Sequence, residues 1–270
     1  MFFPVSGVTA PLWLPPLVGF AISLFTSMVG VSGAFLLLPF QMSVLGYVSP
    51  SVSATNLVFN LVAIPSGVSR YAREGRMDWP LARVIAAGTL PGLLAGWWLR
   101  VHWLPQPHAF KFFVGVVLAA LAVHLLAGFP GRSVVPTVGP AEFPPMRPVF
   151  FAALGIGVIG GAYGIGGGSL MAPVLVAVFG LSVHAVAGAA LFGTFITSAG
   201  GVALYQFLPA PPDMETRPDW ALGILFGLGG AVGAYLGARL QIHVAQHVLK
   251  LGLALLLGAL SATYVIQFFR

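Results

Sequence analysis

Long apolar stretches without charge, separated by short charged connectors, organise this chain of 270 residues. Asp, Glu, Lys and Arg are absent from residues 1–69, 84–99, 112–131, 148–212, 220–238 and 251–269. A transmembrane helix needs about 20 mainly apolar residues. The pattern predicts three long membrane helices in each half of the chain, at 51–71, 79–99 and 109–129, then at 183–205, 220–239 and 248–268.

An apolar segment interrupted by glycines precedes each set of three helices, at 12–46 and at 148–180. The first interruption reads Gly30-Val31-Ser32-Gly33, and the second reads Gly164-Ile165-Gly166-Gly167-Gly168-Ser169. Glycine destabilises a helix by up to about 1 kcal/mol per residue and permits backbone conformations that other residues avoid. We therefore expect both segments to unwind inside the membrane.

The two halves also align with each other in sequence. At an offset of 134 positions, Gly33 aligns with Gly167 and Pro39 with Pro173; at an offset of 141, Asp78-Trp79 aligns with Asp219-Trp220. This duplication predicts an all-α polytopic membrane protein with two homologous halves, residues 1–129 and 148–270, joined by a proline-rich linker at 130–147. Duplicated halves are the usual architecture of secondary transporters.

The relative orientation of the halves depends on the interrupted segments. Two short crossings, or a hairpin that enters and returns, give each half an odd number of crossings and make the repeats inverted. One continuous broken crossing makes them parallel. Both segments are too long for one span, which favours inverted repeats and leaves the parallel arrangement as the alternative.

Composition narrows the class of protein. Charged residues make up 7% of the chain, against roughly 25% in soluble domains, and hydrophobic residues make up 58%. So few charges cannot cover a soluble globule, which excludes a soluble enzyme. High hydrophobicity excludes a disordered chain, and the segments lack the alternation of an outer-membrane barrel.

The net charge of +6 indicates basic loops that face anionic lipid in the cytoplasm. Nucleic acid is not an expected partner, because no basic run is interleaved with aromatic residues. The first Lys or Arg is Arg70, so the basic region of a signal peptide is absent and we expect the first apolar segment to be retained. We expect a multi-pass protein of the bacterial inner membrane, with loop 70–78 in the cytoplasm.

The matched interruptions are also the candidate binding site. Interruptions in corresponding positions of two halves point to the substrate site of a transporter, and each restarting helix offers free N–H groups and a positive dipole end to an anion. Close helix packing at glycine is the alternative reading. The candidate substrate-binding residues are Gly30, Ser32, Gly33, Asn56, Asn60, Gly166, Gly167, Gly168, Ser169, His184 and Thr194.

Polar side chains in the predicted spans are few. Asn56 and Asn60 share a helix face, and Thr194 aligns with Asn60; such residues bind an oxyanion or form bonds between helices. His184, the only histidine in its long uncharged stretch, would contact an anion, relay a proton or be structural. No Asp or Glu lies within a predicted span interior, which favours an anionic substrate. We expect no catalytic residue, metal or cofactor.

Two glycine ladders with a spacing of four, at 88–92–96 and 229–233–237, indicate close helix packing. The sequence leaves open whether these ladders pack within one chain or between two copies. A homodimer through the ladder helices is therefore a possible assembly.

The duplicated glycine interruption followed by leucine and proline resembles the sulfite exporter TauE/SafE family of bacterial permeases. The resemblance is carried by Gly30, Gly33 and Pro39, and by the stretch Gly164 to Gly168 with Pro173, while Ser32 and Ala34 stand where the second copy has Gly166 and Gly168. It implies export or uptake of sulfite, organosulfonates or related sulfur oxyanions by a secondary transporter.

Two other functions remain as alternatives. A passive anion channel could share the same fold. The motif Gly30-Val31-Ser32-Gly33 also fits the GxSG pattern of rhomboid intramembrane proteases, with His124 as the possible base for Ser32. The alignment of Ser32 with Gly166 argues against the protease.

Overall fold

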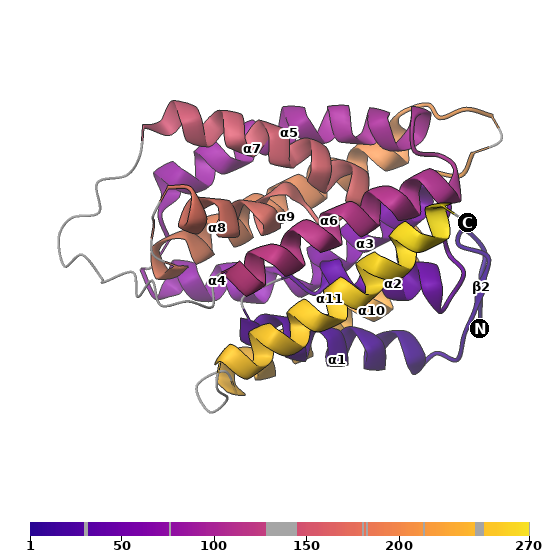
Figure 1. The fold of residues 1–270 in the computed structure, drawn as a ribbon, viewed down its shortest axis with the longest axis horizontal. Helices are drawn as coiled ribbons and strands as arrows, with labels where there is room; N and C mark the ends of the chain where they lie inside the picture. The colour runs from indigo at the N-terminus through magenta and orange to yellow at the C-terminus, as the bar shows by residue number, and fades with distance from the viewer. Residues whose placement is uncertain are drawn as a thin grey trace.

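The computed structural model describes residues 1–29, 32–75, 77–127, 145–179, 181, 183–212, 214–240 and 246–269. Apart from a short hairpin of β1 (Phe2–Phe3) and β2 (Val8–Thr9), the regular elements of these residues are helices. Figure 1 shows them packed side by side in one elongated bundle, with both chain ends at its right-hand side. The first half contains α1 (Leu14–Val29), α2 (Ala34–Ser43), α3 (Ser51–Ala63), α4 (Pro65–Arg73), α5 (Trp79–His102) and α6 (Pro107–Ala127). The second half contains α7 (Met146–Tyr163), α8 (Gly167–Ala177), α9 (Val183–Phe207), α10 (Trp220–Leu240) and α11 (Gln246–Phe269).

Six helical stretches of the described chain are long and apolar enough to cross a membrane. They are Ser51–Arg73, Trp79–His102, Pro107–His124, Met146–Tyr163, Val186–Phe207 and Trp220–Gly237. The prediction of a polytopic helical membrane protein is confirmed, and five of the six predicted long helices correspond to these stretches. The sixth, 248–268, falls within α11. The predicted linker lies largely outside the described residues, and α7 begins just inside its boundary.

Each interrupted segment is a hairpin in the structure. After α1, helix α2 leads back to the end of the bundle where α3 begins and where the Tyr47 hydroxyl bonds the Ser51 hydroxyl. After α7, helix α8 leads to the start of α9 at the opposite end. Gly164 and Gly166 turn the chain between α7 and α8 with φ of 85° and 73°, which side chains disfavour. The short helices α2 and α8 therefore start inside the bundle and point to opposite ends.

Both glycine ladders pack within the chain. Gly88, Gly92 and Gly96 of α5 lie on the carbonyls of Phe150, Leu154 and Val158 in α7. Gly229, Gly233 and Gly237 of α10 lie in the same way on the carbonyls of Pro16, Phe20 and Leu24 in α1. These faces are occupied by neighbouring helices, so the structure gives no support to a homodimer formed through them.

The same contacts fix the directions of the helices. Successive glycines of α5 contact successively later residues of α7, so these two helices are parallel. The same holds for α10 and α1. Helix α10 also runs parallel to α3, because Gly223 lies on Val58 and Gly227 on Val62. Since α5 follows α3–α4 after a short turn, α5 and α10 run in opposite directions, and so do their partners α7 and α1.

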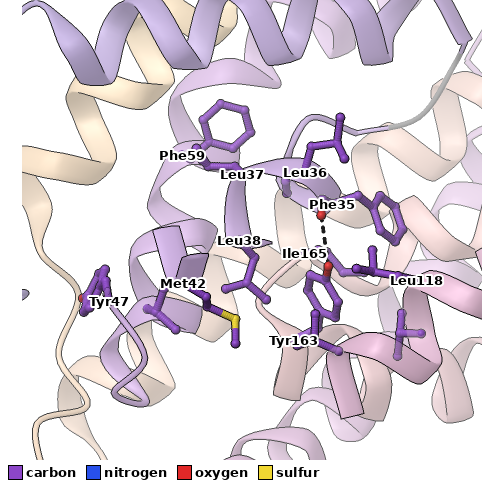
Figure 2. Close-up of a cluster of buried hydrophobic side chains, with 14 of the residues drawn as sticks. Phe35, Leu36, Leu37, Leu38, Met42, Tyr47, Phe59, Leu118, Tyr163 and Ile165 are labelled. Carbon is purple, nitrogen blue, oxygen red and sulfur yellow. Dashed lines mark hydrogen bonds between the residues drawn. The ribbon is translucent and has the colours of Figure 1, made fainter. Parts of the chain in front are cut away.

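Helix α2 is buried on nearly every side, which explains why its sequence is apolar without a periodic polar face. Phe35, Leu37 and Leu38 are no more than 1% exposed and pack in one cluster with Leu118 of α6 and Phe226 of α10. Figure 2 shows this cluster around α2, with Tyr163 of α7 beneath it. An interrupted segment is thus held in the core of the bundle and not at its lipid-facing surface.

The two ends of the bundle hold different elements. One end, on the left of Figure 1, holds Arg73, Arg83, Arg147 and Arg239 and is called the basic end below. The other holds the N-terminal hairpin and the C-terminal end of α11 and is called the terminal end.

An aspartate stands at the start of α5 and at the start of α10, which occupy equivalent places in the two halves of the chain. Asp78 accepts a hydrogen bond from Leu81 N (2.7 Å) at the start of α5, and Asp219 accepts one from Leu222 N (3.1 Å) at the start of α10. Both are N-caps three residues before the bonded amide, a preferred position for aspartate. Asp219 additionally accepts bonds from the backbone N–H and hydroxyl of Ser6, which ties the N-terminal hairpin to the terminal end.

Candidate functional site

The N-terminal ends of α2 and α8 meet in the interior of the bundle. Asn60 of α3 lies between them: its Nδ2 donates to the Ile165 carbonyl (2.9 Å), and its Oδ1 accepts from the Ser32 hydroxyl (3.3 Å). Ser32 directly precedes Gly33, the N-cap of α2, and Ile165 directly precedes Gly166, the N-cap of α8. One amide group therefore joins the two interruptions.

Asn56, one turn earlier on α3, makes a second bridge. Its Nδ2 donates to the Ala34 carbonyl (3.1 Å) at the start of α2 and to the Gly164 carbonyl (2.8 Å) of the second interruption. Both asparagines are fully buried. The amide hydrogens of Asn56 are thus used on backbone carbonyls in this conformation, while its Oδ1 is buried without a partner among the described residues. We call Asn56 and Asn60 the asparagine clamp.

The carbonyls at the end of α7 receive hydrogen bonds from side chains of other helices. The last carbonyls of a helix have no partner within it and must be satisfied elsewhere when buried. Tyr205 donates to Gly161 O (3.0 Å), and Ser53 donates to Ala162 O (2.9 Å). With the clamp on Gly164 and Ile165, helices α3 and α9 hold the unwound chain in place.

Hydroxyl groups line the start of α8 from α9. Ser169 Oγ lies 3.1 Å from Thr194 Oγ1. Ser169 donates to Ile165 O, and Thr194 donates to Ala190 O. On the other side, the hydroxyls of Thr89 and Thr197 lie 2.8 Å apart. No side chain caps α8. The positive dipole end of α8 therefore lies beside neutral hydroxyls.

Neighbouring helices pack closely on the glycines of the interruptions. A Cβ built at Gly33 would lie 2.9 Å from Ser23 Oγ, and one at Gly166 would lie 2.9 Å from Ser198 Oγ. A Cβ at Gly167 would lie 2.6 Å from Thr89 Cγ2. These glycines therefore serve close helix packing, the alternative interpretation of the sequence. Close packing is compatible with a binding site at the same positions.

The structure brings most of the candidate residues together and separates one. Gly30 lies outside the described residues. His184 lies in the first turn of α9, ten residues before Thr194, which is about 15 Å along a helix. It is thus not part of the cluster at the interruptions. The residues gathered there are Ser32, Gly33, Asn56, Asn60, Gly166, Gly167, Gly168, Ser169 and Thr194.

Several residues of this cluster were not among the sequence candidates. Tyr205 donates to Gly161 O in the last turn of α7, Tyr163 donates to Phe35 O (3.0 Å) in α2, and Thr89 packs on Gly167. The spacing of hydrophobic positions does not single out the two tyrosines, because a tyrosine in an apolar helix is interpreted as a core aromatic residue. Their one sequence signal is the rarity of hydroxyl groups within uncharged stretches.

No charged side chain forms part of the cluster among the described residues. The nearest buried cation of the bundle is Arg100, at the terminal end of α5, where it donates to the carbonyls of Leu104 and Val48 and lies 3.6 Å from the centre of the Phe110 ring. In the adjoining loop, burial raises the pKa of the Tyr47 hydroxyl well above its ordinary value. Tyr47 therefore stays a neutral hydrogen-bonding anchor for α3.

The comparison with protein families decides the class of this chain. The model of the sulfite exporter TauE/SafE family matches residues 16–264. The chain belongs to this family. The match spans both interruptions and all helices from α1 to most of α11, so it includes every element of the candidate site. The chain is thus a membrane transporter of this family and not an intramembrane protease.

Curated relatives cover nearly the same length. "Probable membrane transporter protein YjnA" of Bacillus subtilis is 26% identical over 89% of this chain and 98% of its own. "Probable membrane transporter protein y4hK" of Sinorhizobium fredii is 25% identical over 82% of this chain and 85% of its own. A "Probable membrane transporter protein" of Xylella fastidiosa is 26% identical over 93% and 91%. No solved structure gives a significant match.

Proposed function

We propose that this protein is a secondary transporter of small sulfur oxyanions, such as sulfite or organosulfonates, which bind between the N-terminal ends of α2 and α8. The observation that carries the proposal is the meeting of the uncapped start of α8 with the start of α2 at the asparagine clamp. An oxyanion inside a bilayer must exchange its hydration for fixed dipoles. Helix N-termini supply such dipoles without a buried cation.

The donors for the anion are the backbone N–H groups at Gly167 and Gly168. The hydroxyls of Ser169 and Thr194 join them once they leave the carbonyls of Ile165 and Ala190, to which they donate in this conformation. The clamp has its amide hydrogens on carbonyls in this closed conformation. Opening of the interruptions would free those hydrogens for a bound oxyanion. Asn56 and Asn60 thus serve as partners that exchange backbone carbonyls for substrate oxygens.

We also propose that the two halves are inverted repeats that exchange roles during transport. The ladder contacts support it: shifting Phe150, Leu154 and Val158 by 134 positions gives Pro16, Phe20 and Leu24, the residues that the second ladder contacts. The opposed directions of α1 and α7, and the matching caps Asp78 and Asp219, support it further. On this proposal residues 1–129 and 148–270 are the two repeats, and a rocking motion would expose the site alternately at either end.

Binding to the purified protein is the direct test. Sulfite, sulfate, thiosulfate and small organosulfonates are compared for their effect on the melting temperature. A ligand at about 100 times its Kd stabilises the folded state by about 2.7 kcal/mol, so at least one sulfur oxyanion should raise the melting temperature by a few degrees.

A pair of threonine variants locates that binding. Thr194→Val removes a hydroxyl at α8, whereas Thr263→Val removes one on the exposed face of α11, where it bonds Ala259 O. The shift should fall in Thr194→Val and persist in Thr263→Val. A screen without any stabilising oxyanion contradicts the proposed substrate class, and an unchanged shift in Thr194→Val contradicts the proposed site.

We place the protein in the bacterial inner membrane with the basic end in the cytoplasm, because short loops rich in arginine are retained there. The chain has no cysteine, so single cysteines report their own position. Ala72→Cys, exposed on α4 at the basic end, should resist an impermeant thiol reagent added to intact spheroplasts, while Gln106→Cys at the terminal end should react. Both sites avoid Gly75, whose φ of 66° would strain a cysteine. The reverse labelling pattern would invert the orientation.

A further inference from the structure

A groove lies between the N-terminal ends of α5 and α7, apart from the clamp and the interruptions. Its volume is about 630 Å³, and its lining consists of Arg83, Val84, Ala87, Met146, Arg147, Phe150 and Phe151. The two helices are held together deeper in the bundle by the ladder contact of Gly88 on Phe150 O. The groove therefore sits at the basic end, beside the first turns of α5 and α7.

The chemistry of the lining is that of a site for an amphipathic anion. Arg83 and Arg147 provide two exposed guanidinium groups, and the lining contains no carboxylate. The first turn of α7, which includes Met146 and Arg147, has no side-chain cap, so its free N–H groups add to the positive potential. A negatively charged group is the complement of this wall.

The remaining lining excludes a purely polar occupant. Val84, Ala87 and Phe150 follow the arginines along their helices toward the middle of the bundle, and Phe151 is 67% exposed. Trp79, 46% exposed, begins α5 one turn before Arg83. Exposed tryptophans collect at the level of lipid headgroups, which puts the arginines at that level and the apolar wall at the level of acyl chains.

We propose that this groove binds one anionic phospholipid, with its phosphate on Arg83 and Arg147 and an acyl chain along Ala87 and Phe151. Basic pockets between membrane helices at the cytoplasmic side suit such headgroups. The lipid would hold the starts of α5 and α7, one helix from each half, at a fixed separation. This site is independent of the anion that the protein transports.

The test measures phosphatidylglycerol that stays with the protein after purification from vesicles of equal phosphatidylglycerol and phosphatidylcholine. The double variant Arg83→Gln/Arg147→Gln should retain roughly 30-fold less phosphatidylglycerol, since each arginine contributes about 1 kcal/mol to anionic lipid binding. The control is Arg73→Gln/Arg239→Gln, which removes two exposed arginines at the same end but outside the groove. It should stay within about twofold of the unmodified protein, because charge screening limits distant arginines.

Three results would overturn the proposal. Equal losses in both double variants would mean that lipid responds to the overall charge of the basic end. Unchanged retention in Arg83→Gln/Arg147→Gln would mean that the groove does not hold lipid. Displacement of the lipid by millimolar inorganic phosphate would mean that the groove recognises free phosphate. Melting temperatures of all variants verify that each is folded.

Discussion

Replacing Gly92 with leucine is expected to lower the free energy of unfolding by about 3 kcal/mol or more, at or above the upper end of overpacking costs. Gly92 faces the Leu154 carbonyl and the Gly157 Cα of α7, so any side chain there meets backbone and not a movable side chain. The two helices would have to separate along the whole ladder. Size-exclusion chromatography and thermal melting of the protein in detergent measure this loss of stability.

Gly155 is the matched control for this substitution. It lies on α7, and a Cβ there would meet nothing within 4 Å. Gly155→Leu should be neutral or slightly stabilising, because leucine favours a helix over glycine by up to about 1 kcal/mol. Gly233→Leu, at the equivalent position of the second ladder on Phe20 O, should destabilise as strongly as Gly92→Leu. Unequal effects at Gly92 and Gly233 would contradict the equivalence of the two halves.

The sequence predicts the helices well because charge is so costly in a bilayer that its absence marks each span. Asp78 and Asp219, each directly before a tryptophan, become helix caps at the predicted helix starts. Length alone favours two short crossings or a returning hairpin over one continuous broken crossing, and the interrupted segments are hairpins in the structure. Length works here because a membrane of fixed thickness leaves few options for the path of an apolar chain.

The site was harder to predict, since hydrogen-bond partners depend on which helices meet. Asn56 and Asn60 were correctly expected to share a helix face, but that spacing does not reveal that their amide hydrogens bond the carbonyls of two separate interruptions. Tyr205 illustrates the same limit, because nothing local to it indicates a bond to Gly161 O on another helix. His184 was selected for its rarity, and rarity carries no information on depth along a helix.

Gly167→Ala is expected to weaken binding of the transported anion roughly 5- to 100-fold, the equivalent of an overpacking cost of about 1–3 kcal/mol. Gly167 opens α8 without a positive φ, so alanine suits its backbone, unlike Gly166 at 73°. The effect is therefore steric. The new Cβ would lie 2.6 Å from Thr89 Cγ2 and 3.2 Å from Gly157 Cα, and the start of α8 would shift away from its binding position.

Substitutions of Thr89 separate this steric effect from a general disturbance of the fold. Thr89→Ser removes the methyl group that Gly167→Ala meets and keeps the hydroxyl that bonds Thr197. The double variant Gly167→Ala/Thr89→Ser should regain part of the lost affinity, but not all, because Thr89 Cβ stays 2.9 Å from the new methyl group. Gly167→Ala/Thr89→Val keeps the bulk and removes the hydroxyl, so it should regain none. Isothermal titration with the oxyanion that stabilises the unmodified protein measures each affinity. Equal affinities for the two double variants would show that the Thr89 methyl group does not displace α8.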